Sequence, residues 1–305
     1  MNIPHFKGLI AAVFTPFHSD GSLNLTVIPR YAKWLKEAGV AGVFVCGSSG
    51  EGLLMDTEER KAVAEAWMPH AEDNFRIIVH VGSTSAKTAS ELSRHAAAAG
   101  AHAVGCIGPC IFQPRDVISL TRFCAEVASA IPDIPFYYYH IPTVSGVNVK
   151  MNDFLLVAGK TIPNLAGIKY TSSDLMTMEE CISLEGGKYD IIHGYDELLL
   201  AGLTYGIKAA IGTTYNFMAP LYLEMMKRFR EKDLEKALEL QQKANRLISV
   251  MLGTGSAISG GKVMMRLVEI DCGPCRAPLN NLEEGQQLLF EDELRKAGYF
   301  NLFQV

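Results

Sequence analysis

Short apolar segments alternate with longer amphipathic segments from near the start of the chain to about residue 231. This repeat constrains the fold more than any other feature, because it is typical of parallel strands that are joined by helices. We predict eight strands, at residues 9–13, 42–46, 77–81, 103–107, 134–139, 165–169, 189–193 and 209–212. All are apolar on both faces, so the sheet they form must be covered on both sides.

The segments between these strands have the spacing of amphipathic helices. In the first segment the apolar residues that share one helical face are Val27, Tyr31, Leu35 and Ala38. Gly39 is placed to end this helix, since glycine readily takes the left-handed backbone conformation found there. Asp56 and Glu59 have the spacing of a capping box and predict that the next helix begins at this point.

Eight such units predict an α/β fold, a (β/α)8 TIM barrel in which helices surround a closed parallel sheet. An open doubly wound sheet is the alternative, but the GxGxxG fingerprint that would favour it is missing after the first strand, where Thr15-Pro16-Phe17 follows. We assign residues 1–231 to the catalytic barrel. Residues 232–305 are predicted to form a C-terminal helical extension, with helices at 234–252, 261–270 and 282–297, packed on the outside of the barrel or at a subunit contact.

Composition limits the classes of partner. The chain has 305 residues, 49% of them apolar, and a net charge of −5 without any cluster of Lys and Arg. A protein of this length can bury a large core. The absence of a basic patch argues against binding to nucleic acid or to an anionic membrane. We therefore expect a small-molecule partner.

The sequence also predicts a cytoplasmic location. The apolar run at residues 8–14 lacks a signal-peptide cleavage pattern, and no apolar run reaches the roughly 20 residues that span a bilayer. Seven cysteines scattered through apolar segments are typical of reduced core residues. Cys272 and Cys275 have CxxC spacing, but a zinc site would need a second pair nearby. We predict no metal site.

Lys169 is the first candidate for chemistry, because it closes an apolar segment and is followed by the polar residues Tyr170-Thr171-Ser172-Ser173-Asp174. An amine that is held in a poorly solvated site loses part of its preference for the charged form, and the neutral amine can attack a ketone. The alternative is a lysine that carries its charge to water on a flexible stem.

The carboxyl ends of strands in a barrel of this kind meet at one face, so the polar residues after each strand are considered together. The loop Gly47-Ser48-Ser49-Gly50-Glu51-Gly52 follows the second strand, and its amides and hydroxyls suit a carboxylate. An ordinary Gly/Ser turn is the alternative. Alternation in the fifth strand places Tyr137 and Tyr139 on one face and Tyr138 on the other.

Two acids, Asp196 and Glu197, follow the seventh strand. Adjacent acids at a helix start are often caps or partners of the helix dipole. At the mouth of a barrel they are also suited to accept hydrogen bonds from the hydroxyls of a sugar.

Taken in order, the motifs at these strand ends resemble a known family. They are Gly47-Ser48-Ser49-Gly50-Glu51, Tyr139-His140-Ile141-Pro142, Gly167-Ile168-Lys169-Tyr170-Thr171-Ser172, Gly194-Tyr195-Asp196-Glu197 and Gly212-Thr213-Thr214-Tyr215-Asn216. Together they resemble the N-acetylneuraminate lyase and dihydrodipicolinate synthase family of pyruvate-dependent class I aldolases. The resemblance covers essentially the whole chain.

The resemblance implies a Schiff base on Lys169 and proton transfer by Tyr139. It implies that Ser48 and Ser49 hold the carboxylate of pyruvate. The residues that would hold the hydroxyl-bearing part of a sugar are Thr171, Gly194, Asp196, Glu197 and Thr213. The implied reaction is a retro-aldol cleavage of N-acetylneuraminate into pyruvate and N-acetylmannosamine, without a metal or organic cofactor, in a homotetramer.

Two positions bear on the substrate. The synthases have an arginine where this chain has Val144, so a dicarboxylic semialdehyde would lack its counter-ion. Ile111 and Phe112 stand where many members have a tyrosine that reaches the neighbouring subunit's site, so that relay is not expected here. Another pyruvate-dependent aldolase or synthase, such as a dihydrodipicolinate synthase-like enzyme or a 2-keto-3-deoxy sugar acid aldolase, is the nearest alternative. A non-catalytic ligand-binding barrel is the more distant one.

Overall fold

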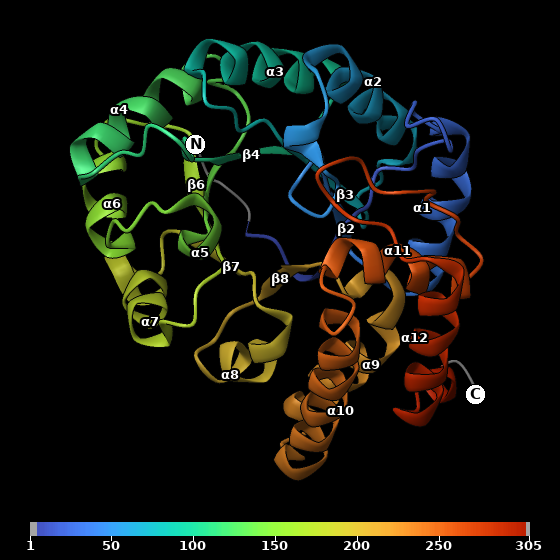
Figure 1. Ribbon diagram of the computed structural model, residues 1–305. Coiled ribbons are helices and arrows are strands. Elements are labelled where there is room, and N and C mark those ends of the chain that lie inside the picture. Colours follow the sequence, from blue (N-terminus) through green and yellow to red (C-terminus); the bar gives the residue numbers. More distant parts are fainter. Residues whose placement is uncertain (1–4, 303–305) are drawn as a thin grey trace.

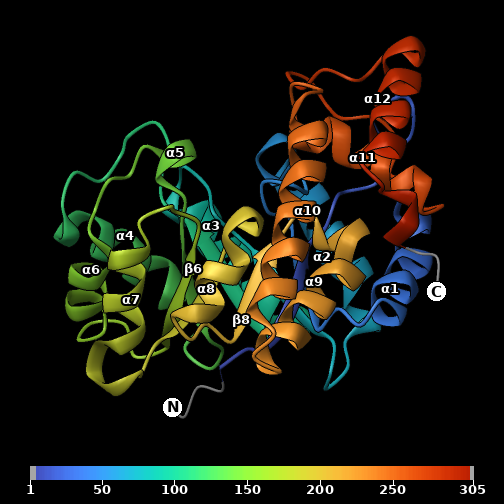
Figure 2. The same ribbon diagram turned by 90° about the horizontal axis from the view of Figure 1, so that it is seen from below.

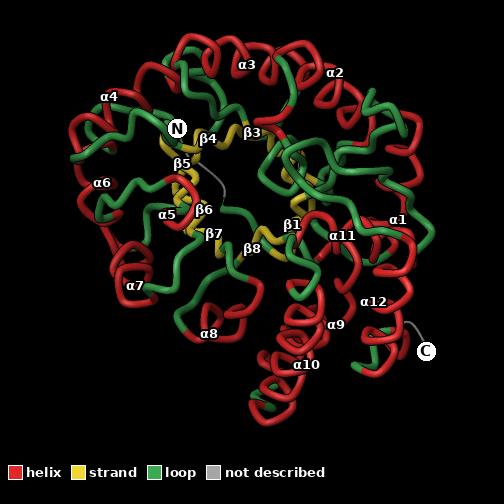
Figure 3. Tube along the Cα trace, in the orientation of Figure 1, coloured by secondary structure: helices red, strands yellow, loops and turns green. Residues whose placement is uncertain are grey.

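The computed structural model describes residues 5–302, and its strands form a closed barrel (Figure 3). The eight strands in chain order are β1 Gly8–Ala12, β2 Gly42–Val45, β3 Arg76–His80, β4 Ala103–Ile107, β5 Phe136–His140, β6 Leu165–Tyr170, β7 Asp190–His193 and β8 Ala209–Gly212. Each strand pairs in parallel with its neighbours, and β8 closes the ring by pairing with β1. The predicted barrel is therefore confirmed, and the open doubly wound sheet is excluded.

Helices surround this barrel on its outside (Figure 1). In chain order they are α1 Ile28–Glu37, α2 Thr57–Trp67, α3 Ala86–Ala99, α4 Val117–Ala128, α5 Pro142–Ser145, α6 Met151–Ala158, α7 Leu175–Ser183, α8 Leu199–Thr204 and α9 Tyr215–Arg230. Short 3-10 turns are η1 Leu25–Val27, η2 Gly52–Leu54, η3 Met68–His70, η4 Leu184–Gly186, η5 Asp196–Leu198 and η6 Phe300–Leu302. The capping box predicted from Asp56 and Glu59 is present at the start of α2.

The strands end within one or two residues of the predicted positions, and the differences have local causes. Strand β2 stops at Val45 because Cys46 takes a left-handed backbone conformation, with φ of 57°. The fifth strand begins at Phe136, not at residue 134, because the amide of Ile134 is used in a turn to the carbonyl of Ile131 and Pro135 has no amide hydrogen.

Alternation along each strand separates two apolar clusters. The residues inside the barrel include Ile10, Phe44, Ile78, Tyr137, Tyr139 and Ile192. Tyr138 faces the helices and packs against Phe154 of α6 at a ring-centroid distance of 5.0 Å. The predicted alternation of the three tyrosines is thus confirmed, and it brings the Tyr139 phenol ring toward the barrel axis.

The last three helices are α10 Leu234–Leu252, α11 Ala257–Leu267 and α12 Glu284–Lys296. Figures 1 and 2 show them gathered on one side of the barrel, next to α9. Helix α11 begins four residues before its predicted start, because Ser256 accepts hydrogen bonds from the amides of Ile258 and Ser259 and caps it. Within residues 5–302, no single helix is long and apolar enough to cross a membrane; only α10 and α11 together meet that criterion, and they are bent by 111°.

Candidate active site

Lys169 lies inside the barrel near the carboxyl end of β6, directly opposite Tyr139 on β5. Its Nζ is 3.9 Å from the ring centroid of Tyr139 and 4.2 Å from that of Phe44, and the residue is only 5% exposed. Burial lowers the pKa of Lys169, while Tyr139 and Asp196 oppose the shift. Lys169 lies at a strand end, as expected from the sequence. The rings of Phe44 and Tyr139 cover its amine, so the side chain does not extend into water as the alternative interpretation required.

A cavity of about 290 Å³ opens beside Lys169 at this face of the barrel. All nine residues that the sequence indicated as site residues line it: Lys169, Tyr139, Ser48, Ser49, Thr171, Gly194, Asp196, Glu197 and Thr213. They come from the ends of five different strands or the loops that follow. The structure therefore brings the whole predicted set together, while the role of each residue stays a prediction.

The loop after β2 places two hydroxyls at the cavity. Ser49 is buried and its Oγ lies 2.6 Å from Oγ1 of Thr213, which follows β8. Ser48 is exposed. The amides of Glu51 and Gly52 donate to the carbonyls of Ser48 and Gly47 within the loop itself. The loop is thus held in a tight turn that leaves Ser48 and Ser49 facing the space next to Lys169.

Asp196 is buried at the start of η5, and its carboxylate holds the loop that follows β8. Its Oδ2 accepts hydrogen bonds from the amide of Thr214 at 2.9 Å and from the Thr214 hydroxyl at 2.6 Å. Burial raises the pKa of Asp196 to about 6, with a contribution from Glu197, and the hydrogen bonds from Thr214 oppose this. The alternative interpretation as a helix cap is wrong for Asp196, since neither η5 nor α8 has a side-chain cap; both acids do lie in the first turn of η5, where a negative charge interacts favourably with the helix dipole.

Gly194 is required by a close approach between two loops. A Cβ atom at this position would lie 1.9 Å from Oγ1 of Thr171. The amide of Gly194 donates to the carbonyl of Tyr170, and the amide of Thr171 donates to the carbonyl of His140, so the ladder hydrogen bonds continue past the strand ends. The loops after β6 and β7 are packed against each other and form one wall of the cavity.

Asn216 supports the site, although sequence reasoning gave it no role. Its Nδ2 donates to the carbonyls of Ala12 and Thr213, and its Oδ1 accepts a hydrogen bond from the Tyr31 hydroxyl at 2.6 Å. The side chain is fully buried. Its position shortly after a strand end was the only sequence feature that pointed to a role at the site. Sequence reasoning could not identify that role, because Ala12 of β1 and Tyr31 of α1, two of its partners, are distant in the sequence.

The C-terminal extension was expected only on the outside of the barrel or at a subunit contact, and the structure shows that it also reaches the site. Apolar residues of α10 and α11 form part of the cavity wall: Ile248, Met251, Leu252, Ala257 and Ile258. The sequence could not show this, because the direction of α10 depends on how it packs against α9.

Other positions noted in the sequence lie away from the cavity lining. Val144 in α5 is 61% exposed, and Ile111 and Phe112 after β4 are 75% and 86% exposed. Cys272 and Cys275 are unpaired and buried, and burial raises the pKa of both thiols. Between residues 5 and 302, no group of three or more His, Cys, Asp or Glu side chains is placed to hold a metal ion.

Comparisons with known proteins agree with this geometry. The model of the dihydrodipicolinate synthetase family matches residues 5–297. The N-acetylneuraminate lyase of Mus musculus is 35% identical over 299 residues, which are 97% of this chain and 93% of the mouse protein. Among solved structures, the N-acetylneuraminate lyase of Proteus mirabilis superimposes with a TM-score of 0.94 at 41% identity and covers 97% of this chain and 100% of its own.

The native structure of the N-acetylneuraminate lyase (sialic acid aldolase) of Aliivibrio salmonicida is similarly close, with a TM-score of 0.94 and 40% identity over 97% of this chain and 98% of its own. On the family match and these relatives, the chain belongs to the dihydrodipicolinate synthetase family.

Proposed function

We propose that this protein is an N-acetylneuraminate lyase, a carbon–carbon lyase that reversibly splits N-acetylneuraminate into pyruvate and N-acetylmannosamine in sialic acid catabolism. The observation that carries the proposal is the buried amine of Lys169, held between the rings of Phe44 and Tyr139 in the cavity at the barrel's carboxyl face. Relatives of 35–41% identity that bear this name cover nearly the whole chain.

In this proposal Lys169 forms a Schiff base with the ketone of the open-chain substrate, and one water molecule is released. Burial favours the neutral amine that must attack, since it lowers the pKa of Lys169. The substrate carboxylate lies against the hydroxyls of Ser48 and Ser49, which face the same cavity. This places the ketone carbon beside Nζ.

Cleavage then follows from the charge on the iminium nitrogen. Tyr139, whose phenolic proton passes to the substrate's own carboxylate, takes the proton from the C4 hydroxyl, the C3–C4 bond breaks, and its electron pair moves into the iminium to form an enamine. N-acetylmannosamine leaves as the aldehyde. Protonation of the enamine carbon and hydrolysis of the iminium release pyruvate and restore the amine of Lys169. Because the lysine serves as the electron sink, the mechanism needs no metal or organic cofactor.

The sugar end lies along the wall formed by the loops after β6, β7 and β8. Its hydrogen-bonding groups are Thr171, Gly194, Asp196, Glu197 and Thr213. One carboxylate oxygen of Asp196 already accepts two hydrogen bonds from Thr214. We therefore expect Glu197 to be the main acceptor for the sugar hydroxyls, and Asp196 to hold the loop after β8 in place. Neither group suits the carboxylate of a dicarboxylic semialdehyde, because like charges repel.

We further propose a cytoplasmic homotetramer, and a division into a catalytic barrel at 1–231 and an extension at 232–305. The first four and last three residues of these spans lie outside the described residues. Support for an assembly comes from Ile111 and Phe112, two large apolar side chains that a monomer would leave in water.

The proposal is tested by pyruvate release from N-acetylneuraminate, followed with a coupled dehydrogenase and no added metal. Robust release supports the lyase. No release from folded protein whose Lys169 is still trapped by pyruvate and borohydride would leave a pyruvate aldolase that acts on another aldehyde. No trapping at all would favour a non-catalytic barrel.

A further inference from the structure

Glu51 belongs to the loop after β2, yet its side chain points away from the cavity toward the C-terminal extension. The residue has a left-handed backbone, with φ of 55°, and its side chain is fully buried. Its Oε1 lies 2.7 Å from Nζ of Lys262 on α11, and its Oε2 accepts a hydrogen bond from the amide of Arg276 at 2.7 Å. A carboxylate at this depth needs such partners, because an unpaired buried charge is costly.

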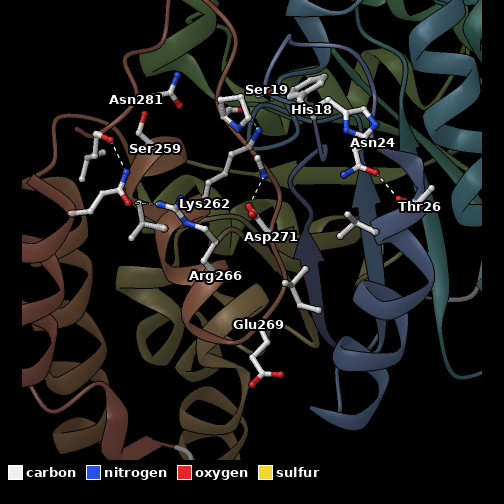
Figure 4. A pocket seen from close by; sticks show the side chains of 18 of the residues that line it. His18, Ser19, Asn24, Thr26, Ser259, Lys262, Arg266, Glu269, Asp271 and Asn281 are labelled. Atoms are coloured by element: carbon white, nitrogen blue, oxygen red, sulfur yellow. Dashed lines mark hydrogen bonds between the residues drawn. The ribbon is translucent and has the colours of Figure 1, made fainter. Parts of the chain in front are cut away.

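Lys262 is equally enclosed. It is 4% exposed, its Nζ donates to the carbonyl of Pro274 at 2.7 Å, and it lies 4.6 Å from the ring centroid of Phe17. Figure 4 shows Lys262 at the wall of a separate cavity of about 730 Å³, between Ser259 and Asp271. The lysine therefore connects α11 to the barrel loops by specific polar contacts and not by general packing alone.

Arg276 also connects the C-terminal extension to loops of the barrel. Its guanidinium donates to the carbonyls of Gly21 and Leu54 and forms an ion pair with Glu59 of α2. The loops after β1 and β2 are thus both held by the segment that follows α11. Such a segment can set loop positions that the barrel strands do not determine themselves.

The loop held in this way carries Ser48 and Ser49. Thr15 anchors it from the other side, since its hydroxyl donates to the carbonyl of Gly50 at 2.6 Å. A buried ion pair adds little net stability, because the loss of hydration offsets the attraction between the charges. It does impose one geometry on the loop that carries the two hydroxyls.

We propose that Glu51 and Lys262 are positioning residues that hold the loop Gly47–Gly52 so that Ser48 and Ser49 meet the substrate carboxylate. The C-terminal extension thereby controls affinity for the carboxylate end, although neither side chain lines the substrate cavity. This inference rests on the proposed function, because it takes the carboxylate of pyruvate as the group that the loop binds.

The test measures how much pyruvate is needed to trap Lys169 with borohydride, by mass spectrometry of the adduct. The variants are Glu51→Gln, which keeps the shape and removes the charge, and Lys262→Met. We expect the half-saturating pyruvate concentration to rise about tenfold in each, since a charge-assisted contact that orders the loop is lost. The trapping rate at saturating pyruvate should change by less than about threefold, because neither substitution alters Lys169.

Lys296→Met on α12 is the matched control, since it removes an exposed lysine of the same extension whose partners are Asp292 and Glu293. This control should leave the half-saturating pyruvate concentration unchanged. Lys262→Arg keeps the positive charge, so its half-saturating concentration should lie close to that of the unmodified protein. An unchanged half-saturation point in either folded variant overturns the inference; if one variant does not fold, the other decides. Absence of trapping in the unmodified protein refutes the proposed Schiff base instead, so the two failures are distinguishable.

Discussion

The amine of Lys169 lies between the rings of Phe44 and Tyr139, and the proposed chemistry depends on its Nζ atom. Replacement by alanine removes the only nucleophile that we propose, so Lys169→Ala should lower pyruvate release by roughly three orders of magnitude or more. Circular dichroism should be unchanged, because the substitution removes polar surface from the cavity and not from the core. Lys150→Ala, at an exposed lysine before α6, is the control. Appreciable residual cleavage by Lys169→Ala would rule out the Schiff-base assignment.

Asp196 gives a prediction about pH, because its pKa is raised to about 6. As pH falls through that value the carboxylate gains a proton and loses its negative charge, so its oxygens accept hydrogen bonds more weakly. We expect kcat/KM for N-acetylneuraminate to fall on the acid side near pH 6, and this limb to be absent in Asp196→Asn. A pH profile of both proteins checks this, and an identical acid limb in the variant would contradict it.

The same pKa affects stability with a defined sign. The folded pKa of about 6 lies above the ordinary value of 3.8, so between these values the folded protein binds more protons than the unfolded chain. The contribution of Asp196 is therefore complete below pH 3.8 and is lost as pH rises toward 6. Substitution by Asn removes this dependence, which denaturant titrations at several pH values can detect.

At the scale of elements, the loops after β6 and β7 approach so closely that only glycine fits at Gly194. A methyl group there would lie 1.9 Å from the Thr171 hydroxyl, so the two loops must separate. We expect Gly194→Ala to lower kcat/KM at least tenfold and to cost about 1–3 kcal/mol in unfolding free energy. Steady-state kinetics and urea titration measure these two effects.

Gly285 near the start of α12 is the control, because a Cβ there meets nothing within 4 Å. Gly285→Ala should leave activity unchanged and stability unchanged or slightly higher, since alanine favours the helix. Full activity of Gly194→Ala would mean that the loops can separate without harm to the site.

The extension is the element whose role changed most between sequence and structure. Its helical pattern was clear in the sequence, but the pattern says nothing about which surface α10 and α11 cover. In the structure they supply an apolar part of the cavity wall, while Lys262 and Arg276 hold barrel loops. The family match, residues 5–297, includes most of this extension.

For the whole molecule, we predict a solution mass four times that of the 33.4 kDa chain. Phe112 is 86% exposed in the single chain, and burial against a neighbouring copy would remove that apolar surface from water. Phe112→Asp should shift the mass toward smaller species in sedimentation equilibrium. Phe112→Tyr keeps most of the apolar surface and should not. A monomeric mass for the unmodified protein at micromolar concentration would refute the assembly.

The order and approximate bounds of strands and helices were within reach of the sequence alone. Strand β6 was predicted from its apolar run and ends one residue later than expected, and the capping box at Asp56 located the start of α2. Such signals are local: they depend on the conformations and hydrogen bonds of neighbouring residues. Eight repeats of them suffice to indicate a barrel, because a parallel sheet must be covered on both faces.

What the tertiary structure alone decided are the contacts between elements that are distant in the chain. The hydrogen bond of Ser49 with Thr213 depends on closure of the ring. The close approach of Gly194 to Thr171 depends on the pairing of β6 with β7, and the ion pair of Glu51 with Lys262 depends on the path of α11. Periodicity determines which way a side chain points within its element. It carries no information about which partner stands opposite, because that is determined by packing across the whole molecule.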